Sequence, residues 1–306
     1  MTAADLTHLH ALLRRAAAWP GLDAETSADY DAARELVARL ADRFDAMNDA
    51  ERERLDLNAD LPQLAFHLEE ELRAGVAETT PGSLAFMRRH IPRLLAEHRD
   101  GAHERLDALD AELVLGLARL TRRVYDERFA AHYVRAGYRR PFVDKLYRDY
   151  ALSGVPGGLL LALRRLARAD EFDVVVCVLK GALPYVLLME LLGLPAGRVR
   201  HVMAGRSTGS HIAPEYAVEP LGFDLEELAN RRVLIVDNNA ATGATLGHLM
   251  YALAPARTTL FLDYALAPLP RLAHTFDRVV CGPFPPAAAR ALKRDIVARL
   301  GFVSTR

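Results

Sequence analysis

Lysine and cysteine are scarce in this 306-residue chain. Lysine occurs only at positions 145, 180 and 293, so arginine supplies nearly all of the 39 basic side chains. The two cysteines, Cys177 and Cys281, lie in separate apolar runs, and there is no CxxC pair or other zinc-like spacing. The sequence therefore argues against a cysteine zinc site and predicts that both thiols are small buried side chains.

Long apolar segments and an excess of one charge are also missing. No stretch of about 18 residues is apolar and free of charge, which argues against a membrane-spanning helix. The first ten residues, MTAADLTHLH, lack the basic and then apolar pattern of a signal peptide. The net charge of −1 gives no electrostatic reason to expect nucleic acid or a membrane surface as a partner. We therefore expect a cytoplasmic protein that binds neither.

The first half of the chain has the pattern of helices. A chain of this length favours two domains, and residues 1–155 are expected to form an all-α helical domain whose role the sequence does not identify. Apolar residues recur at helical spacing from Leu36 to Met47, with Ser27 or Asp29 as the expected cap, and again from Leu106 to Val124. His90, His98 and His103 do not have a compact metal-ligand spacing.

The second half, residues 156–306, has the alternating pattern of an α/β domain. Helices are expected at 159–169, 182–192 and 243–253. The expected strands are Phe172–Leu179, Val199–Met203, Arg232–Val236, Thr258–Tyr264 and Arg278–Cys281. This order predicts a parallel five-stranded sheet flanked by helices, with any ligand at the carboxyl ends of the strands.

One strand end has the residues of a phosphate site. In the segment VLIVDNNAATGAT, a buried strand ends at Asp237, small residues follow, and a helix begins near Gly243. Unpaired amides and the dipole at a helix start attract a phosphate, and Thr242 and Thr245 add hydroxyl donors. The alternative is an ordinary strand–turn–helix corner with a threonine cap. Neither GxxxxGK[ST] nor a GxGxxG after a strand is present.

This segment resembles the PRPP-binding signature of type I phosphoribosyltransferases, in which an apolar strand leads to two acids, small residues and Thr-Gly-x-Thr. Asp237 falls on the first acid and Asn238 on the second. The resemblance then implies that the 5-phosphate is held by the residues from Ala240 to Thr245, namely Ala240, Ala241, Thr242, Gly243, Ala244 and Thr245.

Two further segments resemble the same family. The turn VLKGA, with Leu179, Lys180 and Gly181, is similar to the diphosphate turn of the hypoxanthine-guanine branch, which often has a cis peptide bond at the position of Leu179-Lys180. The segment from Gly205 is similar to the mobile catalytic loop, with Arg206 and Ser207 as its basic and hydroxyl residues. The long stretch to Asn230 would be that loop and its return, although a plain surface loop fits equally well.

The resemblance implies a glycosyltransferase of the phosphoribosyltransferase type. It would move ribose 5-phosphate from PRPP to an unidentified acceptor, usually a nitrogen, and release diphosphate with Mg²⁺. Asp237 would contact a ribose hydroxyl or the metal, Arg206 would act as a counter-charge, and Asp263 could reach the acceptor. Homodimers are common in the family, so a homodimer is also an expectation.

Two departures from the family pattern keep other functions open. Asn238 carries no charge, and Ala241 stands where 6-oxopurine enzymes have an aspartate that handles a purine proton, which argues against hypoxanthine or guanine salvage. One alternative is a catalytically inactive regulatory protein that senses PRPP or a nucleotide. Another is a phosphorolysis or hydrolysis in the same pocket. The resemblance covers only residues 172–300.

Overall fold

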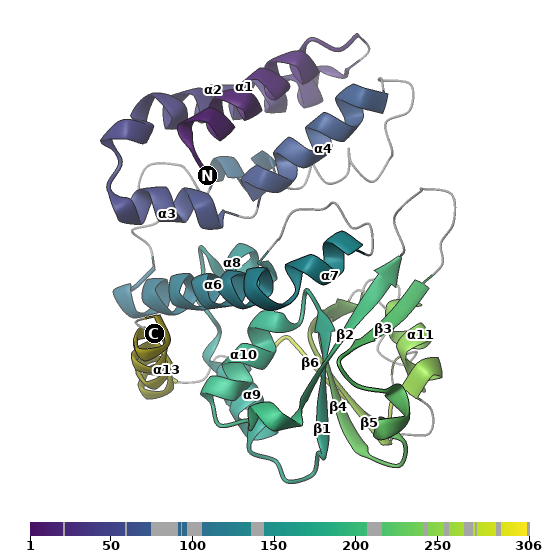
Figure 1. The fold of residues 1–306 in the computed structure, drawn as a ribbon. Helices are drawn as coiled ribbons and strands as arrows, with labels where there is room; N and C mark the ends of the chain where they lie inside the picture. The colour runs from purple at the N-terminus through teal and green to yellow at the C-terminus, as the bar shows by residue number, and fades with distance from the viewer. Residues whose placement is uncertain are drawn as a thin grey trace. The chain divides into compact units, whose positions relative to one another are not determined.

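The computed structural model describes the chain except for residues 21, 59, 75–90, 93, 97–105, 136–143, 207–215, 241–243, 254–256, 266–271, 273, 286–288, 305 and 306. The chain forms two compact units (Figure 1). The first comprises Met1–Ala108 and Arg140–Ser153, and the second comprises Leu109–Arg139 and Gly154–Arg306. This division differs from the predicted one, 1–155 and 156–306, because the segment Leu109–Arg139 belongs with the sheet.

The first unit is helical, as the sequence predicts. Its elements are α1 (Ala3–Ala17), α2 (Ala24–Arg43), η1 (Phe44–Ala46), α3 (Asp49–Leu57), α4 (Asp60–Ala74) and α8 (Lys145–Tyr150). Helix α2 begins earlier than the sequence predicted. Its cap is Asp23, whose carboxylate accepts a hydrogen bond of 2.7 Å from the amide of Thr26, so neither Ser27 nor Asp29 caps it.

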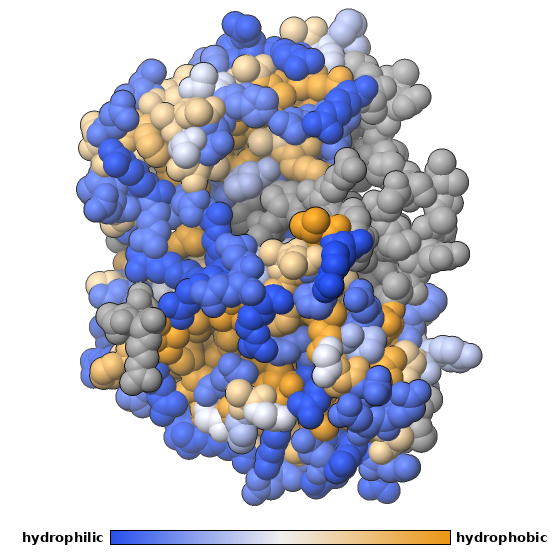
Figure 2. Space-filling model, viewed as in Figure 1, coloured by the Kyte–Doolittle hydropathy of each residue, from blue (hydrophilic) through white to orange (hydrophobic). Residues whose placement is uncertain are grey.

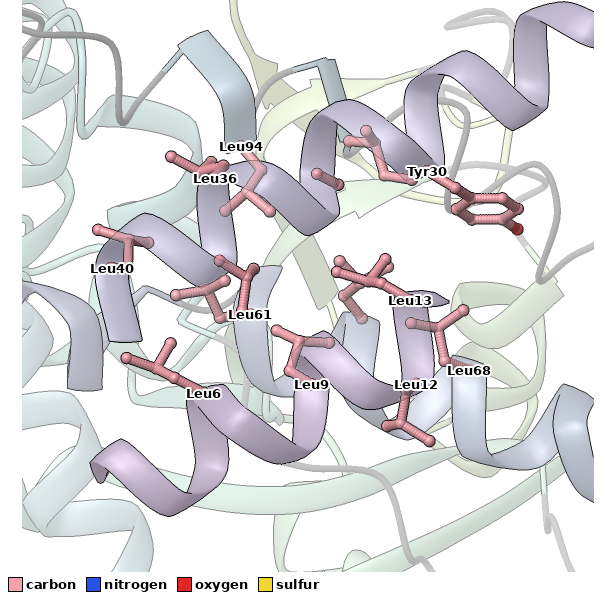
Figure 3. Packing of buried hydrophobic residues seen from close by; sticks show 14 of the residues in the cluster. Leu6, Leu9, Leu12, Leu13, Tyr30, Leu36, Leu40, Leu61, Leu68 and Leu94 are labelled. Atoms are coloured by element: carbon pink, nitrogen blue, oxygen red, sulfur yellow. The ribbon is translucent and has the colours of Figure 1, made fainter. Parts of the chain in front are cut away.

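The core of the first unit is built mainly from leucines on helices α1, α2 and α4 (Figure 3). These helices place apolar residues three or four positions apart, which gives each of them one buried stripe. The stripes meet around fully buried side chains, among them Leu6, Leu13, Tyr30, Leu61 and Leu68. The unit therefore has a core of its own.

Helix α4 also buries two acidic side chains, Asp60 and Glu71. Removal from water raises the pKa of Glu71 to about 7. Because the folded state holds this proton more tightly than the unfolded chain does, the unit loses stability as the pH rises from about 4.5 through 7.

The second unit contains a six-stranded sheet in the order β3-β2-β1-β4-β5-β6. The strands are β1 (Val174–Leu179), β2 (Val199–Arg206), β3 (Tyr216–Leu221), β4 (Arg232–Ala240), β5 (Arg257–Ala265) and β6 (Arg278–Cys281). All neighbouring pairs are parallel except β2 and β3. The predicted α/β class is confirmed, but the sheet is mostly parallel instead of wholly parallel and has six strands instead of five.

The additional strand is β3, which lies in the segment that the sequence indicated as a loop. It pairs antiparallel with β2 at the edge of the sheet, where Val202 lies opposite Pro220. Proline cannot donate a ladder hydrogen bond and is tolerated on an edge strand. A short strand that contains proline lacks the continuous apolar pattern of the buried parallel strands, so β3 is hard to recognise in the sequence.

Helices cover both faces of the sheet (Figure 1). Helices α9 (Gly157–Ala167) and α10 (Leu183–Leu191) lie on one side, and α11 (Ala244–Leu253) lies on the other. The unit also contains α6 (Ala108–Arg128), α7 (Ala130–Arg135), α13 (Arg290–Ser304) and the short turns η4 (Ala196–Arg198) and η5 (Leu225–Leu228).

Helix α6, from the middle of the chain, is attached to the C-terminal helix α13. The ammonium of Lys293 donates to the carboxylate of Asp110, and Arg123 donates to the carbonyl of Val303 at 3.1 Å. Gly116 faces Leu300 so closely that an added Cβ would lie 3.0 Å from its Cδ1. These contacts fasten a helix from the middle of the chain to the sheet unit.

The surface shows mixed character. In the view of Figure 2, hydrophilic residues predominate and hydrophobic ones are interspersed among them. Among the residues that the structure describes, no helix combines the length and the apolar character that a membrane span requires.

Two helical glycines give a matched test of packing in the second unit. A Cβ on Gly158 in α9 would lie 1.9 Å from the carbonyl oxygen of Pro285, whereas a Cβ on Gly247 in α11 would meet nothing within 4 Å. We expect Gly158→Ala to lower the free energy of unfolding by about 1–3 kcal/mol. Gly247→Ala should raise it by about 0.5–1 kcal/mol, because alanine favours a helix. Denaturant unfolding measures both, and equal effects would contradict the packing.

Candidate active site

The residues that the sequence singled out occur at the carboxyl ends of neighbouring parallel strands. Strand β1 ends at Leu179, immediately before the turn with Lys180 and Gly181. The adjacent strand β4 carries Asp237 and Asn238 near its end, and β5 carries Asp263 at the level of Asn238, since Asp237 pairs with Leu262 and Asn239 with Tyr264. The fold therefore brings three separate segments to the edge where ligands of such sheets bind.

The turn after β1 packs directly against the end of β4. A Cβ placed on Gly181 would lie 2.2 Å from Oδ1 of Asn238, so only glycine fits there. The Leu179–Lys180 peptide bond is cis, as the resemblance implies. Although 57 positions separate these two residues in the sequence, the diphosphate-like turn and the PRPP-like strand end touch each other.

Asn238 is buried, with 5% of its surface exposed, and has a donor without a partner. Its side-chain Nδ2 forms no hydrogen bond. Its main-chain amide donates to Oδ1 of Asp237 at 2.7 Å. A buried donor without a partner costs about 1–3 kcal/mol, and a ligand oxygen could satisfy it. Asn238 therefore places an unused hydrogen-bond donor at the contact between the two segments.

Asp263 lies next to this contact but is already hydrogen-bonded. The carboxylate is buried, and its Oδ2 accepts a hydrogen bond of 2.7 Å from the hydroxyl of Tyr185 on α10. One residue further along each strand, Nδ2 of Asn239 donates to the hydroxyl of Tyr264 at 2.6 Å. Tyr185 thus contacts a candidate site residue, and the sequence did not reveal it because it lies in a mostly apolar helix.

The charge of Lys180 faces two aromatic rings. Its Nζ lies 5.8 Å from the ring centre of Tyr125 and 5.6 Å from that of Tyr133. These tyrosines belong to α6 and α7, which the sequence assigned to the separate helical half. No local signal revealed the contact, because only the fold brings the helices to the turn.

The structure describes some of the predicted phosphate-site and loop residues and not others. Residues Ser207, Ala241, Thr242 and Gly243 lie outside the described part of the chain. Arg206 is the last residue of β2, and Ala240 is the buried last residue of β4. Ala244 and Thr245 open α11, one residue later than the sequence predicted. A helix of ten residues thus begins close behind β4, as a phosphate site at that position requires.

Cys177 and His201, which lie opposite each other on β1 and β2, are uncharged at neutral pH. Burial, and next the charges of Asp237 and Glu190, raise the pKa of the Cys177 thiol. Burial and nearby arginines lower the pKa of His201 to about 4, so its ring is neutral at pH 7. Both cysteines are free; Cys177 is buried as predicted, whereas Cys281 is partly exposed.

Comparisons with known proteins add resemblance only at the level of structure. No family model and no curated protein matches the sequence. A purine phosphoribosyltransferase from Pyrococcus horikoshii is similar over 40% of this chain and 78% of its own, with 22% identity and a TM-score of 0.30. The AQ2163 protein from Aquifex aeolicus matches 37% of this chain and 55% of its own, with 23% identity and a TM-score of 0.29.

A third similar structure is a hypothetical protein from Neisseria gonorrhoeae with bound ppGpp. It has 11% identity and a TM-score of 0.29, over 47% of this chain and 91% of its own. TM-scores near 0.3 are too low to assign a function.

A double-mutant cycle tests the contact between Gly181 and Asn238. Gly181→Ala should lower the free energy of unfolding by about 1–3 kcal/mol, because its methyl group meets the Asn238 side chain. Asn238→Ala removes that obstacle and should recover at least about 1 kcal/mol in the double variant. Gly197→Ala is the control, since a Cβ there would meet nothing within 4 Å. Additive effects in denaturant unfolding would contradict the contact.

Proposed function

We propose that the second unit is a phosphoribosyltransferase that moves ribose 5-phosphate from PRPP to an unidentified, nitrogen-bearing acceptor and releases diphosphate. The observation that carries this proposal is the close approach of Gly181 and Asn238. It joins the turn that resembles a diphosphate site to the strand end that resembles a ribose 5-phosphate site. A donor with phosphate groups at both ends of its sugar needs two such sites side by side.

In this proposal the start of α11 holds the 5-phosphate. The first amides of a helix have no partner within it, and the helix dipole adds positive character there. The segment from Ala240 to Thr245 supplies these amides, with the hydroxyls of Thr242 and Thr245 as further donors. Lys180 and Gly181 meet the diphosphate. Arg206 would supply a counter-charge to the diphosphate, and Ser207, the next residue in the sequence, a hydroxyl.

A magnesium ion fits these residues only if the substrate supplies most of its ligands. Asp237 is a buried carboxylate next to the proposed sugar site, and no group of three or more potential metal ligands occurs among the described residues. Mg²⁺ commonly binds through one or two carboxylates together with substrate phosphates and water. Asp237 would hold the ion or its water, and the ion would offset the charge of the departing diphosphate.

The chain would act mainly by positioning its donor. As the bond to diphosphate breaks, the sugar carbon becomes cation-like, and fixing both phosphate ends keeps the reacting atoms aligned. Fixed donors and positive charge at the diphosphate stabilise the leaving group. The buried Asn238 side chain would complete its hydrogen bonding on a donor oxygen, and Asp263, held by Tyr185, would border the acceptor.

Asn238 also supports a second candidate, a catalytically inactive protein that senses PRPP or a nucleotide. A neutral amide at the position of the second acid keeps hydrogen-bonding capacity but gives no charge to a metal or to a cation-like sugar. Binding would then persist while the transfer is slow or absent. Ala241 cannot exchange a proton with a purine, which argues in either case against hypoxanthine or guanine as the acceptor.

Diphosphate release separates the two functions. Incubated with PRPP, Mg²⁺ and a panel of bases and amines, the protein should release diphosphate with at least one acceptor. Asp237→Asn should slow release at least about tenfold, because it removes the carboxylate proposed for metal and ribose. Asp170→Asn, at an exposed carboxylate on the protein surface, is the control and should change nothing. Binding without release in every mixture supports the sensor, and absence of binding overturns both.

Replacing Asn238 by aspartate tests the role of the metal. Asn238→Asp puts a second buried carboxylate beside Asp237, which costs stability unless a cation is bound. We expect thermal unfolding at a lower temperature in EDTA, partial recovery with Mg²⁺ and PRPP, and tighter PRPP binding in calorimetry with Mg²⁺. An affinity unchanged by the substitution would count against a metal at this position.

A further inference from the structure

We infer that Tyr125 and Tyr133, on helices α6 and α7, are positioning residues that hold the ammonium of Lys180 ready for the diphosphate. This inference rests on the proposed function, since it assigns Lys180 to the diphosphate of that same site. It also gives part of the helical segment Leu109–Arg139 a role in the site.

The ammonium of Lys180 lies over two neighbouring aromatic rings. The Lys180 Nζ lies 5.8 Å and 5.6 Å from the two ring centres, within the range of about 6 Å at which cation–π attraction is significant. The rings of Tyr125 and Tyr133 are 5.3 Å apart and tilted by 47°, and both side chains are buried. They therefore present two adjacent rings to the same ammonium.

The attraction comes from the ring faces. Burial, and next the charge of Asp126, raise the pKa of Tyr125 to about 12, so its hydroxyl stays neutral at physiological pH. No tyrosinate at this position pairs with the ammonium. Phenylalanine at Tyr125 or Tyr133 should therefore keep most of the interaction, whereas an aliphatic residue should lose it.

The rings are placed independently of any ligand. Helix α6 is bound to α13 through Asp110, Gly116 and Arg123, as described above. Between the two tyrosines in sequence, Phe129 packs on His201 of β2 with ring centres 4.8 Å apart. Helix α6 and the turn that follows it are thus both attached to other elements of the unit that carries Lys180.

Holding the lysine in advance should favour binding. A lysine side chain has four rotatable bonds and loses rotational freedom when it is fixed. If the rings already restrict the lysine side chain, binding of diphosphate does not have to include that loss of rotational freedom. Loss of both rings should then weaken binding of a diphosphate-bearing ligand without changing the ligand's other contacts.

Calorimetric titration with Mg²⁺-PRPP and with Mg²⁺-diphosphate tests this inference on the full chain. We expect Tyr125→Leu with Tyr133→Leu to raise Kd about five- to thirtyfold, and the corresponding double phenylalanine variant to stay within about twofold of the original protein. Phe44→Leu is the control, because it removes an aromatic ring that lies beneath a different cation, Arg52 of the first unit, and it should also stay within about twofold.

A Lys180→Met background distinguishes positioning from a structural effect. There the leucine substitutions should cause no further weakening. The inference is overturned if they weaken binding equally in that background, if they leave Kd unchanged, or if they tighten binding because the rings had kept the lysine away from the ligand. If the double leucine variant does not fold, the single variants decide by the same criteria. Absence of binding by the original protein would instead overturn the proposed function itself.

Discussion

The contact between Gly181 and the Asn238 side chain is the constraint on which the rest of the site depends. It sets how close the turn after β1 comes to the end of β4, and the missing side chain of glycine makes that approach possible. The neighbouring groups are positioned by the same elements. Lys180 precedes Gly181 in the turn, Asp237 precedes Asn238 on β4, and Asp263 lies opposite Asn238 on β5. A larger residue at position 181 would separate the two segments and disperse the site.

The site combines two buried acids with one buried, uncharged amide. Asp237 and Asp263 are buried acids, yet each has a hydrogen-bond donor close to it, the amide of Asn238 in one case and the hydroxyl of Tyr185 in the other. Asn238 carries no charge but retains a buried donor without a partner. The position thus suits an oxygen-rich ligand and avoids placing a third carboxylate where negative phosphates are proposed to bind.

Much of the fold could be read from the sequence because buried parallel strands leave long apolar runs, as in the segments that end at Leu179 and Val236. Strand β3 was not foreseen, since an edge strand that contains Pro220 has no such run. The sequence predicted that both segments follow parallel strands, but the contact between Gly181 and Asn238 appears only in the structure. Tyr125, Tyr133 and Tyr185 could not be anticipated, because their relevance comes from packing between segments that are distant in sequence.

The path of the chain has a consequence for how this protein could be divided. The polypeptide runs through the helical unit to Ala108, contributes Leu109–Arg139 to the sheet unit, returns for Arg140–Ser153, and only then completes the sheet unit from Gly154. No single peptide-bond cleavage can therefore release either unit whole. A break before Gly154 would leave Asp110 on one fragment and its partner Lys293 on the other. A domain exchange by fusion at that point would separate α6 from the sheet of its own unit.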